Sequence, residues 1–310
     1  MKSCIYKELL YGWFSKKYLW LLISLVTIFT GAEIVNYQAA INAYNLHQHY
    51  IDYYNESNLD ITEDINGEYY TNVDEDGVLY VENPLAYSKY EAIRKYYACD
   101  MRYTFEQLLE VGIFLFPIVF TVFGAVMGGT DYKYGTMKLR AAREGKINLN
   151  FAKQCALVIS SIVITALAML ISYIANLFVF SKLQDFVSME DIDTTDYVFS
   201  NMNSLYGIAL ILLLIIFFLE VGYTLSITLK SALIPILGIV LYWYMCPQLS
   251  KFEPRNLVSC LADKVFHFQG CVMISDYTVI NGYLAVGVIV VIMLVLFLIN
   301  FVVSRNRSAY

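Results

Sequence analysis

Catalytic signatures are missing from this sequence. It has no HExxH zinc motif, no GxSxG nucleophile turn, and no pair of aspartates within apolar runs of the kind used for intramembrane proteolysis. The nearest approach to a phosphate-binding loop lies between Gly129 and Gly135, where five residues separate the glycines instead of four and Met137 follows Thr136. We therefore expect that the chain itself is not an enzyme, has no catalytic residues and holds no cofactor.

Histidine is also scarce, with only His47, His49 and His267 in the chain. A His-x-His pair can hold a metal, but no cysteine or third histidine stands close to it in the sequence. Two solvated histidines on a tyrosine-rich helix are the favoured interpretation, and no metal site is predicted.

Charged residues are few. They make up 15% of the 310 residues, hydrophobic residues make up 58%, and the mean hydropathy is +0.55. A soluble domain carries fewer apolar residues than this, so lipid is expected to surround much of the chain. Six apolar runs have the length of about 17 to 25 residues that crosses a bilayer. They are 18–36, 108–130, 154–181, 204–227, 232–248 and 284–303.

The predicted fold class is therefore an all-α polytopic membrane protein with six transmembrane helices. The first run continues into a polar helical pattern and lacks a small-residue cleavage site, so we expect it to be retained rather than removed as a signal peptide.

Lys and Arg are distributed asymmetrically. Six spans put both termini on one side, and cytoplasmic segments carry an excess of Lys and Arg. If the termini and the loops 131–153 and 228–231 are cytoplasmic, that side holds 13 of the 21 Lys and Arg residues. They are Lys2, Lys7, Lys16, Lys17, Lys133, Lys138, Arg140, Arg143, Lys146, Lys153, Lys230, Arg305 and Arg307. The acids gather on the other side, above all in 37–107.

The remaining segments complete the predicted organisation. In order they are a cytoplasmic interfacial helix (1–17), a small extracellular subdomain (37–107), a basic cytoplasmic loop (131–153), an outer loop (182–203), an outer re-entrant or interfacial helical segment (249–283) and a cytoplasmic tail (304–310). Within the subdomain, the first helix is expected to continue outward, two short strands to flank a turn at 74–77, and a helix to return into the second span.

Three acids lie within or beside the spans. Glu33 and Glu110 fall near outer ends, where we expect water to reach them. Glu220 stands ten residues before Lys230, about 15 Å from the inner boundary. An ionisable group at that depth faces protein or a water-filled path. Glu220 is therefore either a structural contact between helices or a residue of a transport path.

Small residues and cysteines give two further predictions. Gly124, Gly128 and Gly129 of the second span allow another helix to approach closely. Cys260 and Cys271 share a predicted outer loop, where a disulfide is permitted, so a bond between them is one of two open possibilities.

The basic loop carries a family resemblance. Six spans, a very short link between the fourth and fifth, an outer helical segment before the sixth, and this loop together resemble the membrane subunits of ABC-2-type (type V-like) exporters, such as bacterial peptide, bacteriocin and toxin exporters. In that family an acidic residue precedes Gly-Thr, and a leucine and then an arginine follow. The matching residues are Asp131, Gly135, Thr136, Leu139 and Arg143, with Asp131 where glutamate is usual. A lysine also enters the third span in the family, and Lys153 matches it.

The resemblance implies a function and its partners. The loop would be a coupling helix seated on a separate cytosolic ABC ATPase, present in two copies, which binds ATP and Mg. A second permease, identical or homologous, and membrane lipid would be the other partners, and no nucleic acid is expected. The chain would export an amphipathic substrate, with a peptide or toxin favoured, across a bacterial plasma membrane. The alternative is a non-transporting immunity or sensor component whose extracellular domain binds a ligand.

Overall fold

The computed structural model describes residues 1–310 except 58, 74–78, 188–203, 269, 275 and 307–310. The helices are α1 (Lys2–Phe14), α2 (Lys17–Glu56), α3 (Ile61–Asp64), α4 (Pro84–Ala98), α5 (Met101–Lys133), α6 (Met137–Glu144), α7 (Lys146–Phe186), α8 (Ser204–Leu229), α9 (Leu233–Val240), the π-helix η1 (Leu241–Met245), α10 (Pro254–Asp263) and α11 (Gly282–Asn306). The strands are β1 (Tyr70–Val73) and β2 (Leu79–Glu82).

Within the described part of the chain, five helices are long and apolar enough to cross a membrane, namely α2, α5, α7, α8 and α11. The chain is therefore a multi-pass membrane protein built almost wholly from helices. The predicted fifth span, 232–248, forms the shorter apolar segment Leu233–Met245, which continues from α9 into η1. At 1.5 Å per residue this segment is about 20 Å long. It ends before Pro247, since the residue preceding a proline disfavours helical geometry.

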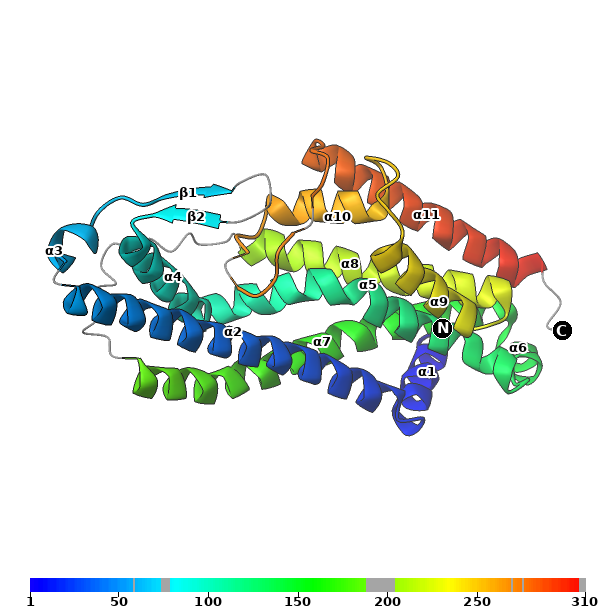
Figure 1. Cartoon of the computed structure of the whole chain (residues 1–310). Coiled ribbons are helices and arrows are strands. Elements are labelled where there is room, and N and C mark those ends of the chain that lie inside the picture. The colour runs from blue at the N-terminus through cyan, green and yellow to red at the C-terminus, as the bar shows by residue number, and fades with distance from the viewer. Residues whose placement is uncertain (58, 74–78, 188–203, 269, 275, 307–310) are drawn as a thin grey trace.

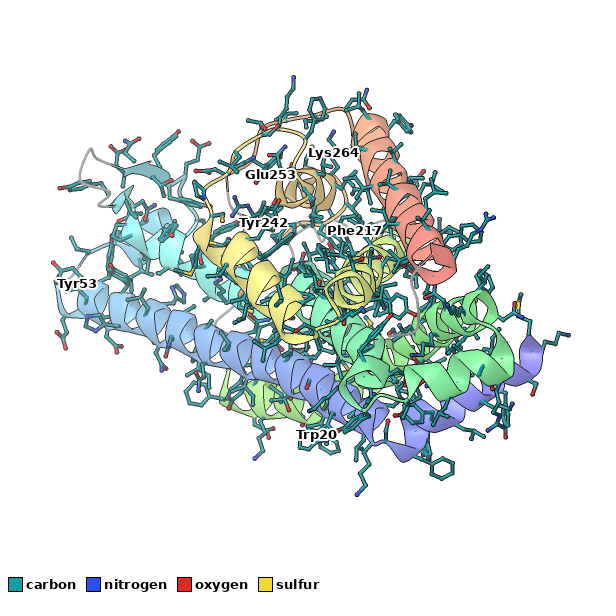
Figure 2. The ribbon with its side chains drawn as sticks, turned by 90° about the vertical axis from the view of Figure 1, so that its right-hand side faces the viewer. Trp20, Tyr53, Phe217, Tyr242, Glu253 and Lys264 are labelled. Atoms are coloured by element: carbon teal, nitrogen blue, oxygen red, sulfur yellow. The ribbon has the colours of Figure 1, made fainter. Side chains whose placement is uncertain are left out.

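The long helices run roughly along one axis of the molecule (Figure 1). α5 and α8 lie side by side in the centre, with α2 and α7 on one side and α10 and α11 on the other. The core between them is rich in aromatic rings, including Phe116 against Phe120 and Phe218 against Trp243. Figure 2 shows Phe217 enclosed by helices, whereas Trp20 points away from α2. Both termini lie at one end of the molecule (Figure 1).

Residue chemistry accounts for several of the boundaries. Asn83 caps α4 by accepting a hydrogen bond from the backbone N–H of Ala86 at 3.1 Å, and Pro84 opens that helix. Asp100 caps α5 in the same way through the N–H of Arg102 at 2.7 Å. Pro117 lies inside α5, where neighbouring helices make a proline tolerable.

The segment between α2 and α5 contains α3, β1, β2 and α4. α2 continues to Glu56, β1 and β2 pair antiparallel with Tyr70 opposite Glu82, and α4 packs back against α2. The turn predicted at 74–77 lies outside the described residues. One expectation was wrong, because His47 is fully buried and its Nδ1 lies 3.0 Å from Ser88 Oγ of α4, so that helix–helix packing excludes water from it. His49 is exposed.

The predicted loop 131–153 is mostly helical. Asp131 belongs to the last turn of α5, α6 occupies the middle, and α7 begins at Lys146. The sharp turn between α5 and α6 passes through Gly135, whose φ of 66° is a left-handed conformation that a residue without Cβ adopts at little cost. The turn sets α6 across the end of the long helices, next to α1.

Candidate functional site

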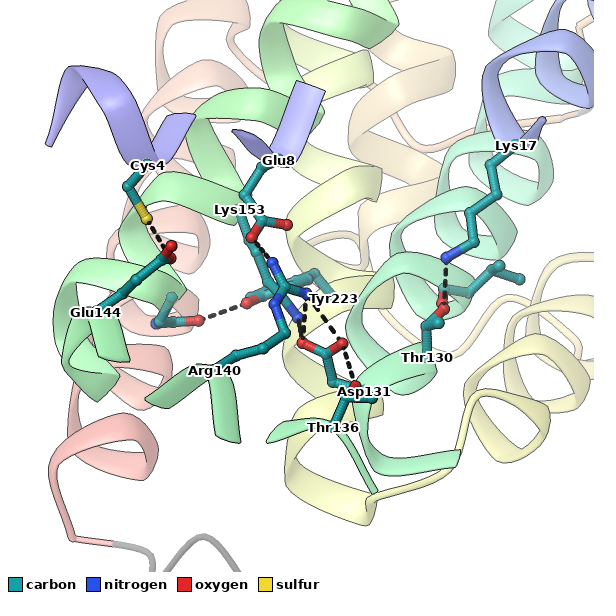
Figure 3. A network of polar contacts seen from close by, with 12 residues as sticks. Cys4, Glu8, Lys17, Thr130, Asp131, Thr136, Arg140, Glu144, Lys153 and Tyr223 are labelled. Carbon is teal, nitrogen blue, oxygen red and sulfur yellow. Dashed lines mark hydrogen bonds and ion pairs between the residues drawn. The ribbon is translucent and has the colours of Figure 1, made fainter. Parts of the chain in front are cut away.

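Asp131 is the centre of a buried ionic network at the end of the molecule that carries both termini (Figure 3). Its side chain is 1% exposed. The carboxylate accepts hydrogen bonds from Thr136 Oγ1 at 2.9 Å, from Arg140 Nη1 at 2.9 and 3.0 Å, and from Lys153 Nζ. One side chain of α5 thus joins the turn, α6 and α7.

Arg140 extends this network to α1. Its Nη2 pairs with Glu8, which is also 1% exposed, and its guanidinium lies 5.1 Å from the centre of the Tyr11 ring. Two buried carboxylates, on Asp131 and Glu8, therefore face two cations, on Arg140 and Lys153. Such a network is tolerable away from water because its charges balance and its hydrogen bonds are made.

A second contact fastens α1 to the end of α6. Glu144 accepts hydrogen bonds from Cys4 Sγ at 2.9 Å and from Lys7 Nζ at 3.1 Å. Burial, followed by the interaction with Glu144, raises the pKa of the Cys4 thiol to about 11. The hydrogen bond from Cys4 lowers the pKa of Glu144 below its usual value. At neutral pH a protonated thiol thus donates to a charged carboxylate.

The structure divides the six residues matched to the family loop into two groups. Asp131, Thr136 and Lys153 belong to the buried network. Gly135, Leu139 and Arg143 are exposed, Leu139 by 74%. The arginine that pairs with Asp131 is Arg140, which is not one of the matched residues. The reason is helical geometry, since residues four apart share a face: Arg140 and Glu144 face α1, while Leu139 and Arg143 face outward.

Sequence reasoning missed Cys4, Glu8, Arg140 and Glu144 as members of this site. A signal was present, because Glu8, Asp131 and Glu144 are the only acids in segments 1–17 and 131–153, which otherwise carry many cations. Each of the three acids has an ion-pair partner on another helix. Isolated acids on the basic side of a membrane protein therefore indicated the network.

Glu220 lies inside the helix bundle at the contact with α11. It is 9% exposed and accepts a hydrogen bond from Asn300 Nδ2 at 2.9 Å. The contact continues to α7, where Asn150 Nδ2 donates to the backbone oxygen of Asn300 at 3.4 Å and Tyr223 Oη donates to Asn150 at 2.6 Å. Glu220 thus has a specific partner, Asn300, for a structural contact between helices. Its place in a transport path stays a prediction.

The disulfide considered between Cys260 and Cys271 is not formed, and both cysteines are free. Cys260 is fully buried on α10, where its Sγ donates to the backbone oxygen of Ile280 at 3.2 Å. Cys271 Sγ lies 4.0 Å from the backbone oxygen of Ala32 in α2. Packing directs the two thiols towards different partners. Among the described residues, no group of three or more His, Cys, Asp or Glu is arranged to hold a metal.

Comparison with models of known protein families, with curated proteins and with solved structures finds no match to this chain. The residues of the network and of α6 are therefore the basis for any functional conclusion.

Proposed function

We propose that this chain is the permease subunit of an ABC-2-type exporter. It moves an amphipathic substrate, such as a peptide or toxin, outward across the bacterial plasma membrane. A separate cytosolic ATPase, present in two copies, binds ATP and Mg and supplies the energy, and a second permease completes the pore. The chain itself carries out no hydrolysis.

The observation that carries the proposal is the two-sided construction of α6. One side is fixed to α1 and α5 through Arg140 and Glu144. The other side exposes Leu139 and Arg143 beyond the ends of the long helices. A helix that passes force from a soluble partner needs both an attachment to the membrane helices and a free surface for that partner. An arginine on the free surface suits carboxylates of the partner, because its planar guanidinium binds them through two hydrogen bonds.

The test uses the full chain purified in mild detergent from its own membranes, with co-purifying proteins identified by mass spectrometry and ATP hydrolysis measured. We expect a nucleotide-binding protein with a phosphate loop and a measurable ATPase activity. Leu139→Asp, Arg143→Glu and Gly135→Val should each lower recovery of that protein about tenfold, equivalent to about 1.4 kcal/mol of binding. The chain should still elute as a folded species.

Arg102→Glu is the matched control for Arg143→Glu. Arg102 is an arginine with a side chain exposed by 81%, and it lies near the start of α5, at the other end of that helix from α6. The control should recover the ATPase as the unmodified chain does. Equal recovery by all the variants, or the lack of any co-purifying ATPase, contradicts the proposal and favours the non-transporting alternative.

The proposed topology has six spans, with the segment α9–η1 as the fifth, and both termini in the cytoplasm. It is supported by the positions of the termini at one end (Figure 1), close to the basic segments of α1 and α6. In a chain without its native cysteines, Ser57→Cys and Asn72→Cys should react with an impermeant maleimide on intact cells. Asn148→Cys should react only after permeabilisation. All three positions are exposed, so accessibility differs only through the membrane. The reverse labelling pattern contradicts this topology.

A further inference from the structure

Five buried polar atoms without hydrogen-bond partners gather where α2 meets α5. They are both carboxylate oxygens of Glu33, Nδ2 of Asn36, and both amide atoms of Gln107, none of which has a partner among the described residues. The three side chains are 2%, 2% and 1% exposed. The sequence led us to expect that water reaches Glu33. This expectation was wrong, because the side chain is buried. The site lies about 24 Å along α2 from Lys17, well away from the ionic network.

The three side chains converge on the segment between α10 and α11. Glu33 and Asn36 are three residues apart on one face of α2. A Cβ placed on Gly270 would lie 3.3 Å from Asn36 Nδ2 and 3.6 Å from Gln107 Cγ. The pKa of the Cys99 thiol is raised to about 12, mainly by burial and next by the charge of the Glu33 carboxylate. That carboxylate therefore lies near the junction of α4 and α5.

No described residue balances the charge of Glu33 by an ion pair. Lys95 of α4 lies near the thiols of Cys99 and Cys271. None of the ion pairs among the described residues includes Glu33. An unpaired carboxylate in a dry site is strongly unfavourable, so Glu33 requires either a bound proton or a bound cation.

The donor set selects the kind of ligand. Carboxylate and amide oxygens are hard ligands that suit alkali and alkaline-earth cations. A half-turn of an amide about its last side-chain bond exchanges its oxygen for its nitrogen, so Asn36 and Gln107 can both present oxygen. The amide N–H groups form no hydrogen bond to the carboxylate of Glu33, so its oxygens are not already occupied by these donors. A single carboxylate balances one positive charge.

We propose that Glu33, Asn36 and Gln107 form a binding site for one monovalent metal cation of the size of Na⁺. The cation neutralises Glu33 and links α2, α5 and the segment around Gly270. It therefore stabilises the packing of that segment on the bundle. This site is independent of the exporter function, and its failure would leave that proposal unaffected.

The experiment follows thermal unfolding of the full chain in lipid nanodiscs at pH 8, with NaCl replaced stepwise by choline chloride at constant ionic strength. Because a ligand that binds only the folded state raises Tm with its concentration, Na⁺ should give a saturable rise in Tm. Choline is too large to enter and should give none. Glu33→Gln, which keeps the shape of the side chain, should abolish the rise. Gln107→Leu should shift the half-saturating Na⁺ concentration upward by about tenfold.

Glu56→Gln is the matched control, since Glu56 is an exposed carboxylate at the end of the same helix, and it should keep the full response to Na⁺. Identical unfolding in NaCl and choline chloride overturns the proposal, and this comparison needs no variant. An Na⁺ response that persists in Glu33→Gln overturns it as well. Stabilisation that follows acidification but not Na⁺ identifies a proton as the occupant, and a larger response to Ca²⁺ identifies a divalent site. Either result refutes the monovalent site.

Discussion

Asp131→Ala is expected to lower the free energy of unfolding by about 3 to 5 kcal/mol, the cost of removing one partner from a buried ion pair. The substitution leaves Lys153 and Arg140 without the carboxylate that both contact. Lys153 is 8% exposed, so water cannot replace the lost partner. The measurement is reversible chemical unfolding in mixed detergent micelles, compared with the unmodified chain.

Two further variants test this explanation. Asp52→Ala removes an exposed carboxylate from α2 and should change stability by less than about 0.5 kcal/mol. Combining Asp131→Leu with Lys153→Met should cost less than Asp131→Leu alone, because the second change removes the cation left unpaired. The ionic explanation fails if Asp131→Ala and Asp52→Ala are equally stable, or if the double variant is the least stable of all.

The same network would connect α6 to the bundle in the way that the proposed coupling function requires. Arg140 contacts Asp131 of α5 and Glu8 of α1, and Lys153 carries the contact into α7. A displacement of α6 therefore acts on three other helices at once. Removal of Asp131 should uncouple the exposed surface of α6 from the bundle, whereas Arg143→Glu should affect only the binding of the partner. The two positions thus separate anchoring from recognition.

Composition and periodicity predicted the long helices, because the length of an apolar run is a local property. Residues 204–227 and 284–303 lie within α8 and α11 as expected, and the polar extension of the first span forms the C-terminal part of α2. The helical segment at the predicted fifth span, 232–248, is shorter than expected. It ends at Met245, because Pro247 follows.

Side-chain partners were less predictable, because they depend on how distant helices cross. Nothing local in the basic loop distinguishes Arg140 from Arg143, and the choice is made by Glu8, 132 residues earlier in the chain. Asn36 and Gln107 likewise lie against Gly270, which is distant from both in the sequence. An isolated acid in a basic segment indicates that the acid has an ion-pair partner, but it does not identify that partner.

Gly222→Ala is expected to destabilise the bundle by about 3 kcal/mol, the upper range for overpacking. A Cβ on Gly222 would lie 2.1 Å from the backbone oxygen of Thr121. Backbone cannot rotate aside as a side chain can, so α5 and α8 would have to separate. Separation would also break the hydrogen bond from Ser226 Oγ to the backbone oxygen of Ala125, which measures 2.8 Å. Gly124, predicted from the sequence to allow close packing, faces the same constraint from Leu219.

Gly287→Ala provides the matched control in a second apolar helix. A Cβ on Gly287 of α11 has no neighbour within 4 Å. Alanine is the better helix former, so this change should leave stability unaltered or raise it by up to about 1 kcal/mol. Both variants are compared by thermal unfolding and by chemical denaturation in the same detergent. If α5 and α8 approach closely, Gly222→Ala should lower stability and Gly287→Ala should not. The same added methyl group meets backbone at the first position and open space at the second. Equal stability of Gly222→Ala and Gly287→Ala would show that the central helix pair tolerates a wider spacing than the structure has.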